Sequence, residues 1–158
     1  MSSSDRISCT RVIDASAEKI FSVVTDPNMH VAIDGSGMLM LAPDAKTLTA
    51  VGDSFAMDMD REPLGDVPLG KYSVVNTVTR IERDRLLEWN VGAPGRTPIG
   101  HVYGYELIPL ADGRTEVTSY CDWTNLTEKM RAMVTFPVVP LSMLEATLAK
   151  LEALITSL

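Results

Sequence analysis

Residues that commonly bind metals or carry redox chemistry are scarce in this sequence. It has only two cysteines, Cys9 and Cys121, and only two histidines, His30 and His101. The cysteines lie far apart and form no C-x-x-C pair, so their spacing indicates neither a zinc site nor a redox motif. We expect them to be small apolar strand residues, with a disulfide between neighbouring strands as the alternative. We expect no metal site and no cofactor.

Basic clusters and long apolar runs are also missing. Fourteen lysines and arginines stand against 21 aspartates and glutamates, for a net charge of -7, and no segment interleaves basic and aromatic residues as nucleic-acid-binding segments do. No run approaches the roughly 20 apolar residues that a membrane span requires. The first residues lack the basic start and apolar stretch of a secretory signal. We therefore expect a cytoplasmic protein without nucleic-acid partners or stable membrane insertion.

The length of 158 residues fits one domain, and we expect residues 1–158 to form it, because the sequence has no internal repeat, low-complexity segment or linker. Residues 6–13 alternate and are rich in β-branched side chains, which predicts a strand. Asp14 and Ser16 can each cap the amphipathic helix that follows. This helix is predicted to end before Pro27.

Between residues 37 and 123 the pattern changes to strands separated by turn signals. Gly113 follows Asp112 between two alternating runs, and an Asp-Gly pair in that position predicts a tight hairpin. Connections this short leave no room for crossover helices, so we expect the sheet to be antiparallel. The predicted strands cover residues 38–41, 47–51, 54–60, 71–82, 86–91, 101–110 and 114–123.

Helical signals return toward the C-terminal end. Residues 125–128, Asn-Leu-Thr-Glu, fit a capping box that begins a short helix, which the prolines at 137 and 140 interrupt. A final helix is predicted over residues 141–156, and we expect it to dock onto the sheet through one apolar stripe. The element order predicts an α+β fold in which a curved antiparallel sheet wraps around one helix. The stripe consists of Leu141, Leu144, Leu148, Leu151, Ile155 and Leu158.

Four stretches, in this order, resemble the START/Bet v 1-like superfamily, also called SRPBCC or polyketide cyclase/dehydrase and lipid transport proteins. They are residues 13–21 with Thr25-Asp-Pro27 behind them, residues 30–38, residues 113–123, and the leucine-rich C-terminal helix. The resemblance implies a helix-grip fold, with a seven-stranded sheet, two short helices after the first strand, and a long C-terminal helix that closes a hydrophobic cavity. Family members often carry an aromatic residue where this chain has Ile33, so a stacking surface is lost there.

Strand alternation and helix spacing predict which side chains face such a cavity. Methionine is flexible and polarizable, and the nine methionines suit a wall that adapts to several apolar shapes. The alternative is that the same side chains fill a solid core. The predicted lining residues are Ile33, Met38, Met40, Phe55, Met57, Met59, Asn76, Trp89, Tyr103, Tyr105, Ser119, Trp123, Met130, Met133, Leu144 and Leu148.

Three functions are compatible with these residues, and the sequence leaves both the ligand and the oligomeric state open. The first is binding, transport or sequestration of a hydrophobic small molecule, such as a lipid or polyketide-like compound. The second is a cyclase or dehydratase that uses the same cavity, with His101 and Tyr103 as catalytic groups for proton transfer. The third is a regulatory protein that binds a partner and keeps only a vestigial cavity. His30 is expected in a surface loop, with a position at the mouth of the cavity as the alternative.

Overall fold

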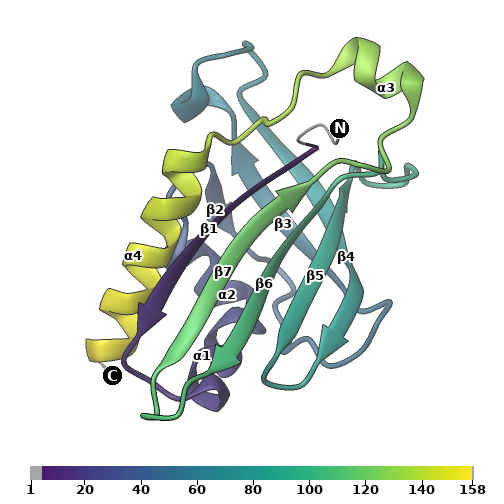
Figure 1. Cartoon of the computed structure of the whole chain (residues 1–158). Coiled ribbons are helices and arrows are strands. Elements are labelled where there is room, and N and C mark those ends of the chain that lie inside the picture. The colour runs from purple at the N-terminus through teal and green to yellow at the C-terminus, as the bar shows by residue number, and fades with distance from the viewer. Residues whose placement is uncertain (1–4, 158) are drawn as a thin grey trace.

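A curved antiparallel sheet of seven strands dominates the computed structural model, which describes residues 5–157 (Figure 1). The strand order is β1-β7-β6-β5-β4-β3-β2. The predicted α+β helix-grip fold is confirmed, including the two short helices between β1 and β2. The strands are β1 (Arg6–Ile13), β2 (Leu39–Leu41), β3 (Ser54–Asp60), β4 (Lys71–Glu82), β5 (Leu86–Gly92), β6 (Val102–Pro109) and β7 (Thr115–Asp122). The helices are α1 (Ala17–Val24), α2 (Pro27–Ile33), the 3-10 turn η1 (Glu62–Leu64), α3 (Glu128–Met133) and α4 (Leu141–Ser157).

Local capping explains why α1 and α2 are separate helices. The Ser16 hydroxyl accepts a hydrogen bond from the Lys19 amide at 3.1 Å and caps α1. Asp26 then caps α2, accepting from the Asn28 amide at 3.0 Å, while Pro27 occupies the first turn, where it costs no hydrogen bond. The Asp-Pro pair therefore ends one helix and begins the next.

Two predictions of local structure, a strand and a helix cap, are wrong for the same reason. Residues 47–51 form no strand, because the Asp53 carboxylate accepts hydrogen bonds from the Thr49 and Ala50 amides and turns the chain. The cap of α3 is Thr127, whose hydroxyl accepts from the Met130 amide at 3.2 Å, and not the predicted Asn125. In both places a side-chain oxygen near the backbone determines the local structure.

Helix α4 covers one side of the concave face through its leucine stripe. Leu144, Leu148, Leu151 and Ile155 are buried, whereas Leu141 at the start of the helix is 39% exposed. Leu158, which the sequence placed in the same stripe, lies outside the described residues. Figure 1 shows α4 running beside β1 at one edge of the sheet, with β4 and β5 on the opposite side.

The two cysteines lie on neighbouring strands and are both free. In the β1–β7 register Cys9 is opposite Ser119 and Cys121 is opposite Ile7, so the two thiols are not paired across the ladder. The alternative of a disulfide is therefore excluded in this structure. Both side chains act as small apolar strand residues.

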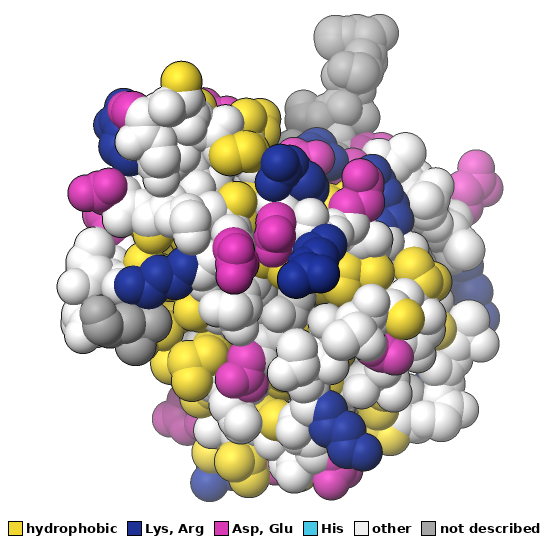
Figure 2. Space-filling view, turned by 90° about the horizontal axis from the view of Figure 1, so that it is seen from below, with side chains coloured by type: hydrophobic (Ala, Val, Ile, Leu, Met, Phe, Trp, Pro, Cys, Tyr) yellow, Lys and Arg dark blue, Asp and Glu magenta, His cyan; other side chains and the backbone are white. Residues whose placement is uncertain are grey.

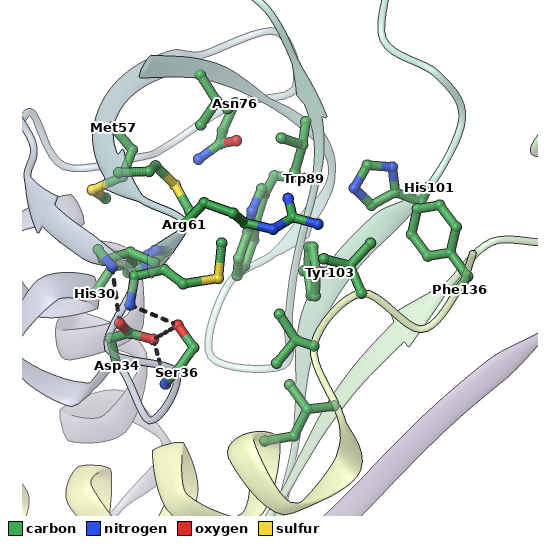
Figure 3. Close-up of a pocket in the computed structure, with 18 of the residues that line it drawn as sticks. His30, Asp34, Ser36, Met57, Arg61, Asn76, Trp89, His101, Tyr103 and Phe136 are labelled. Atoms are coloured by element: carbon green, nitrogen blue, oxygen red, sulfur yellow. Dashed lines mark hydrogen bonds between the residues drawn. The ribbon is translucent and has the colours of Figure 1, made fainter. Parts of the chain in front are cut away.

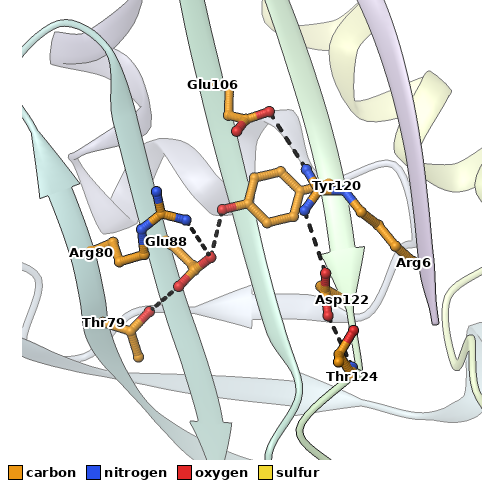
Figure 4. Close-up of polar contacts among 8 residues, drawn as sticks. All are labelled: Arg6, Thr79, Arg80, Glu88, Glu106, Tyr120, Asp122 and Thr124. Atoms are coloured by element: carbon orange, nitrogen blue, oxygen red, sulfur yellow. Dashed lines mark hydrogen bonds and ion pairs between the residues drawn. The ribbon is translucent and has the colours of Figure 1, made fainter. Parts of the chain in front are cut away.

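A polar network fixes the convex face of the sheet at Tyr120 (Figure 4). The Tyr120 hydroxyl donates to the buried Glu88 carboxylate at 2.7 Å, and Thr79 donates to its other oxygen at 2.7 Å. The Arg6 guanidinium lies 4.0 Å from the centre of the Tyr120 ring. Gly104 makes this packing possible, since a β-carbon there would lie 2.4 Å from the tyrosine ring.

Charges of both signs are interspersed on the described residues of the face seen in Figure 2. None of the helices within residues 5–157 combines the length and the apolar character needed to cross a bilayer.

The contact between Gly104 and Tyr120 gives a stability prediction. Gly104→Ala should lower the free energy of unfolding by about 1–3 kcal/mol, because the added methyl group forces the Tyr120 ring from its place. In a Tyr120→Ala background the same substitution should be neutral or stabilising, because alanine restricts the unfolded chain more than glycine does. Urea unfolding of the four proteins measures the coupling. An equal penalty in both backgrounds would contradict this packing.

Candidate functional site

A cavity of about 730 Å³ lies between the concave face of the sheet, α2 and the first half of α4. Strands β3 to β7 supply one wall, and the irregular segment 133–139 closes the side between α3 and α4 (Figure 3). Its volume falls within the range of about 300–1,000 Å³ that is typical of small-molecule sites. The residues that line it include His30, Met38, Met57, Met59, Arg61, Asn76, Trp89, His101, Tyr103, Tyr105, Ser119 and Phe136.

The lower half of the sheet is solidly packed and forms the floor of the cavity. Ile33, Phe55 and Leu148 were predicted to line the cavity, but they are almost fully buried in the core beneath it. Periodicity places these side chains on the correct face, yet it does not report how far along a strand or helix the packing extends. The floor is therefore a solid core, as one alternative predicted. The space above the floor is a cavity, as the other predicted.

Three other predicted lining residues lie away from the cavity. Met40 is 44% exposed, because in β2 its neighbour Leu39 takes the inward position. Trp123 and Met130 belong to a second apolar cluster, in which the Trp123 ring stacks on Phe136 with centroids 5.7 Å apart. Met38, Met57 and Met59 do line the cavity.

The remaining predicted residues are placed around the cavity as expected. Met133 is there but is 69% exposed, so it lies at the rim. Leu144 lines the wall formed by α4. The polar and aromatic members Asn76, Trp89, Tyr103, Tyr105 and Ser119 all come from strands β4 to β7. Contact of any of these residues with a ligand stays a prediction.

His30 is buried and not in a surface loop, so that prediction is wrong. The seven-residue helix α2 turns Pro27, His30 and Ile33 inward at a spacing of three. The His30 Nε2 donates to the Val24 carbonyl at 2.6 Å, and its ring lies 5.0 Å from that of Trp89. Burial lowers the pKa of His30, which keeps the imidazole neutral.

Asn76 brings an unsatisfied polar group to the middle of the cavity wall. Its side chain is 6% exposed, and among the described residues its Oδ1 has no hydrogen-bond partner. A buried amide oxygen without a partner costs about 1–3 kcal/mol, so its position favours a ligand that supplies one. Close by, burial raises the pKa of Tyr105 and keeps its hydroxyl protonated.

His101 and Tyr103 lie together near the mouth, where Phe136 covers the imidazole. The His101 and Tyr103 ring centroids are 5.7 Å apart, and those of His101 and Phe136 are 4.7 Å apart. His101 is 8% exposed, and its Nδ1 has no partner within residues 5–157. Burial lowers the pKa of His101 to about 4 and raises that of Tyr103, so both groups are uncharged at neutral pH.

Sequence reasoning missed Arg61, which reaches into the mouth of the cavity (Figure 3). Its Nε and Nη2 donate to the two Asp66 oxygens at 2.9 and 2.8 Å. This pairing lowers the pKa of Asp66 to about 2. A signal was present, because residues 55, 57, 59 and 61 share one parity and Arg61 extends the inward face of β3 by one step.

A compact turn after α2 forms another part of the rim, and it packs against η1, where a β-carbon at Gly37 would lie 3.3 Å from Pro63. The Asp34 carboxylate accepts hydrogen bonds from the Ser36 amide, the Ser36 hydroxyl and the Leu39 amide, at 2.7 to 3.0 Å. The Gly35 amide donates to the Thr147 hydroxyl of α4 at 2.9 Å. The sequence predicts no nucleophilic or dinucleotide-binding role for this stretch, and in the structure its polar groups are used to reverse the chain.

Comparison with known proteins identifies distant relatives. No family model matches the sequence. The uncharacterized proteins Rv0088 and MT0096, from two strains of Mycobacterium tuberculosis, are 29% and 28% identical to it over 152 residues, which is 93% of this chain. The chain spans 62% of the length of these curated relatives.

Solved structures share the fold at low sequence identity. A protein from Arthrobacter aurescens aligns with a TM-score of 0.68 at 18% identity, over 97% of this chain and 87% of its own. Protein CV1439 from Chromobacterium violaceum aligns with a TM-score of 0.66 at 14% identity, over 96% of both chains. An AHSA1-like protein from Aeromonas hydrophila aligns with a TM-score of 0.61 at 15% identity, over 96% of this chain and 92% of its own. These likenesses support the helix-grip fold that the sequence resemblance implied.

The burial of His101 gives a prediction for stability against pH. Its pKa is about 4 in the folded protein and 6.5 in its ordinary state, so between these values only the unfolded chain takes up the proton. The free energy of unfolding should therefore fall as pH falls through this window, by up to about 3 kcal/mol. His101→Gln should remove that part of the pH dependence. Urea unfolding at about pH 7 and pH 4.5 measures the free energy of unfolding of both proteins. If it falls by the same amount in the wild-type protein and in His101→Gln, His101 is not the source of the pH dependence.

Proposed function

We propose that this protein binds a hydrophobic small molecule in the cavity between the sheet and α4. The observation that carries the proposal is the 730 Å³ space itself, which lies above a packed core and is walled by methionine, valine and aromatic side chains. A space of this size admits water, and an apolar ligand that displaces the water removes apolar wall surface from contact with it. The helix-grip fold, which the solved neighbours share, supports the proposal, because the resemblance to the START/Bet v 1-like superfamily implies a hydrophobic cavity under the C-terminal helix.

Apolar burial alone gives useful affinity in such a site. Covering ~300 Å² of apolar ligand surface at about 25 cal/mol per Å² contributes several kcal/mol before the entropy of binding is subtracted. The flexible side chains of Met38, Met57 and Met59 let the wall adjust to ligands of different outline. We therefore expect affinities in the micromolar range without a covalent or metal-mediated contact.

The polar groups on the wall orient the ligand in this proposal. Asn76, Tyr105, Ser119 and the Trp89 indole come from four neighbouring strands and border the cavity at separate points. A few polar groups on an apolar wall are typical of sites that fix the orientation of a small molecule. The ligand accordingly carries at least one polar group on an apolar skeleton.

Proton-transfer catalysis by His101 and Tyr103 is the second candidate, and one observation favours it. The imidazole has an unpartnered nitrogen beside a phenol at the mouth of the cavity. However, a pKa of about 4 makes His101 a weak base at neutral pH, and the raised pKa of Tyr103 makes it a weak acid. In this state the pair is better suited to hydrogen bonding than to proton transfer, so binding is the primary proposal.

Filling the cavity tests the binding proposal. Ser119 faces the cavity from β7, and Ser119→Phe should weaken binding of the neutral fluorescent probe N-phenyl-1-naphthylamine by about tenfold or more, because the ring occupies space that the probe needs. Thr118→Phe is the matched control, since it adds a ring on the same strand but on the opposite face.

Fluorescence titration gives affinity and stoichiometry for the three proteins. The wild-type protein should saturate with one probe per chain, and Thr118→Phe should change the affinity by less than about twofold. Circular dichroism checks that both variants fold. A probe that fails to saturate the wild-type protein, or that binds both variants equally well, would refute the proposed function.

A further inference from the structure

The mouth of the cavity contains one cationic side chain among neutral neighbours. Arg61 is the only lysine or arginine among the described residues that line the cavity. Its side chain is only 16% exposed, so the guanidinium has exchanged most of its water for protein contacts. The neighbouring His101 and Tyr103 are both uncharged at neutral pH because they are buried. The charged side chains among the described lining residues are therefore Arg61, its partner Asp66, and Asp34.

The pairing with Asp66 uses only one edge of the guanidinium. Nε and Nη2 donate to the two carboxylate oxygens at 2.9 and 2.8 Å, which is the bidentate geometry. A guanidinium carries five N–H groups, so donors remain beyond the two bonds to Asp66, and the Tyr72 phenol of β4, which also lines the cavity, is the further protein group beside them. Figure 3 shows the tip of Arg61 directed into the cavity, between the His30 side and the Tyr103 side.

The two carboxylates that border the cavity do not compete equally for those donors. Asp34 is occupied by the turn after α2, where three donors from Ser36 and Leu39 bond to it. Asp66 has a side chain that is 42% exposed, and its charge is therefore largely screened by solvent. Arg61 has less access to water, so a second acceptor from the cavity side would restore part of its lost solvation.

A second, neutral donor borders the same part of the cavity. Figure 3 shows the tip of Arg61 pointing to the side of the cavity on which Tyr103 lies, and both residues line it. Burial keeps the Tyr103 hydroxyl protonated, so it is able to donate a hydrogen bond to an oxygen anion. The mouth therefore offers a planar cation and a hydroxyl donor, and the Trp89 ring, 6.2 Å from Tyr103 and 6.2 Å from Phe55 of the floor, continues the wall inward as an apolar surface together with Met57.

We propose that the ligand is an amphipathic carboxylic acid, held with its carboxylate at Arg61 and its apolar body toward Trp89 and Met57. The proposal rests on the binding function argued above and names the chemical class of the ligand. A carboxylate matches the fork of a guanidinium, and one arginine is able to serve two carboxylates on its two edges. In this orientation the charged group stays at the mouth and the apolar skeleton lies inside. The skeleton therefore leaves water before the carboxylate does.

Matched pairs of ligands test this proposal on the full chain. Decanoate and 1-decanol share a skeleton and differ in charge, and 2-naphthoate and 2-naphthalenemethanol form the corresponding aromatic pair. Each competes for the neutral probe N-phenyl-1-naphthylamine at neutral pH, and the readout is the ratio of alcohol Kd to acid Kd. The pair with the larger ratio identifies the skeleton, aliphatic or aromatic. Using a ratio cancels losses of affinity that arise from a general change in the cavity.

Two substitutions should move this ratio in opposite directions. Arg61→Met keeps the apolar stem and should lower the ratio by about tenfold, because a charge-assisted hydrogen bond is lost. Asp66→Asn should raise the ratio by about threefold, because it removes the competing negative charge while keeping an acceptor for Arg61. Arg114→Met is the control, since Arg114 also pairs with an aspartate, Asp112, but in the β6–β7 hairpin at the opposite end of the molecule. It should leave the ratio unchanged.

The outcomes separate this proposal from the proposed function. If the neutral probe and the alcohols bind but Arg61→Met does not change the ratio, binding stands and the carboxylate assignment is wrong. If Arg61→Met and Asp66→Asn both lower the ratio, the ion pair only fixes the loop between β3 and β4, and the assignment is again wrong. If neither the probe nor any ligand binds the wild-type protein, the binding function fails, and the assignment with it.

Discussion

The incomplete cover that α4 gives to the sheet is the constraint on which the rest of the structure depends. Its leucine stripe packs on β1, β7 and α2, and this contact seals one edge of the concave face. Because one helix is about 10 Å wide, it does not extend over β3 to β6 as well. The bend of the sheet then leaves a volume that the core side chains fill only at the lower end.

The fold was predictable because its signals are local and repeated, whereas the depth of the cavity was not. Alternation in β3, β5, β6 and β7 identified the inward face, and the spacing of apolar residues in α4 identified the covering helix. Phe55 and Met57 have the same parity in β3, yet one belongs to the floor and the other to the cavity wall. The difference between them depends on how neighbouring elements pack, which no single strand encodes. The second short helix, α2, came from the family resemblance, because seven residues are too few for a clear helical period.

Polar groups in the cavity were harder to find than apolar ones. Arg61 lies just beyond the end of β3, where the alternation was no longer followed, although it keeps the parity of Met57 and Met59. His30 was assigned to a loop because the helix that buries it was not recognised from its own residues. In both cases the side chain is polar and the backbone geometry around it decides its direction. Polar residues near element ends are therefore where a sequence reading of such a fold is weakest.

The close backbone contact at Gly35 makes one wall of the cavity, formed by α2 and α4, more rigid than the others. A β-carbon at Gly35 would lie 2.4 Å from the Met143 carbonyl oxygen, so the turn after α2 rests directly on the backbone of α4. Lys150 of α4 also donates to the Asp34 carbonyl at 2.9 Å. The close approach and the hydrogen bond leave little room for either element to shift against the other. A bulkier ligand is therefore accommodated by the methionines of β3 and by the irregular segment between α3 and α4. These two parts form the flexible wall of the cavity, and α2 and α4 form the rigid one.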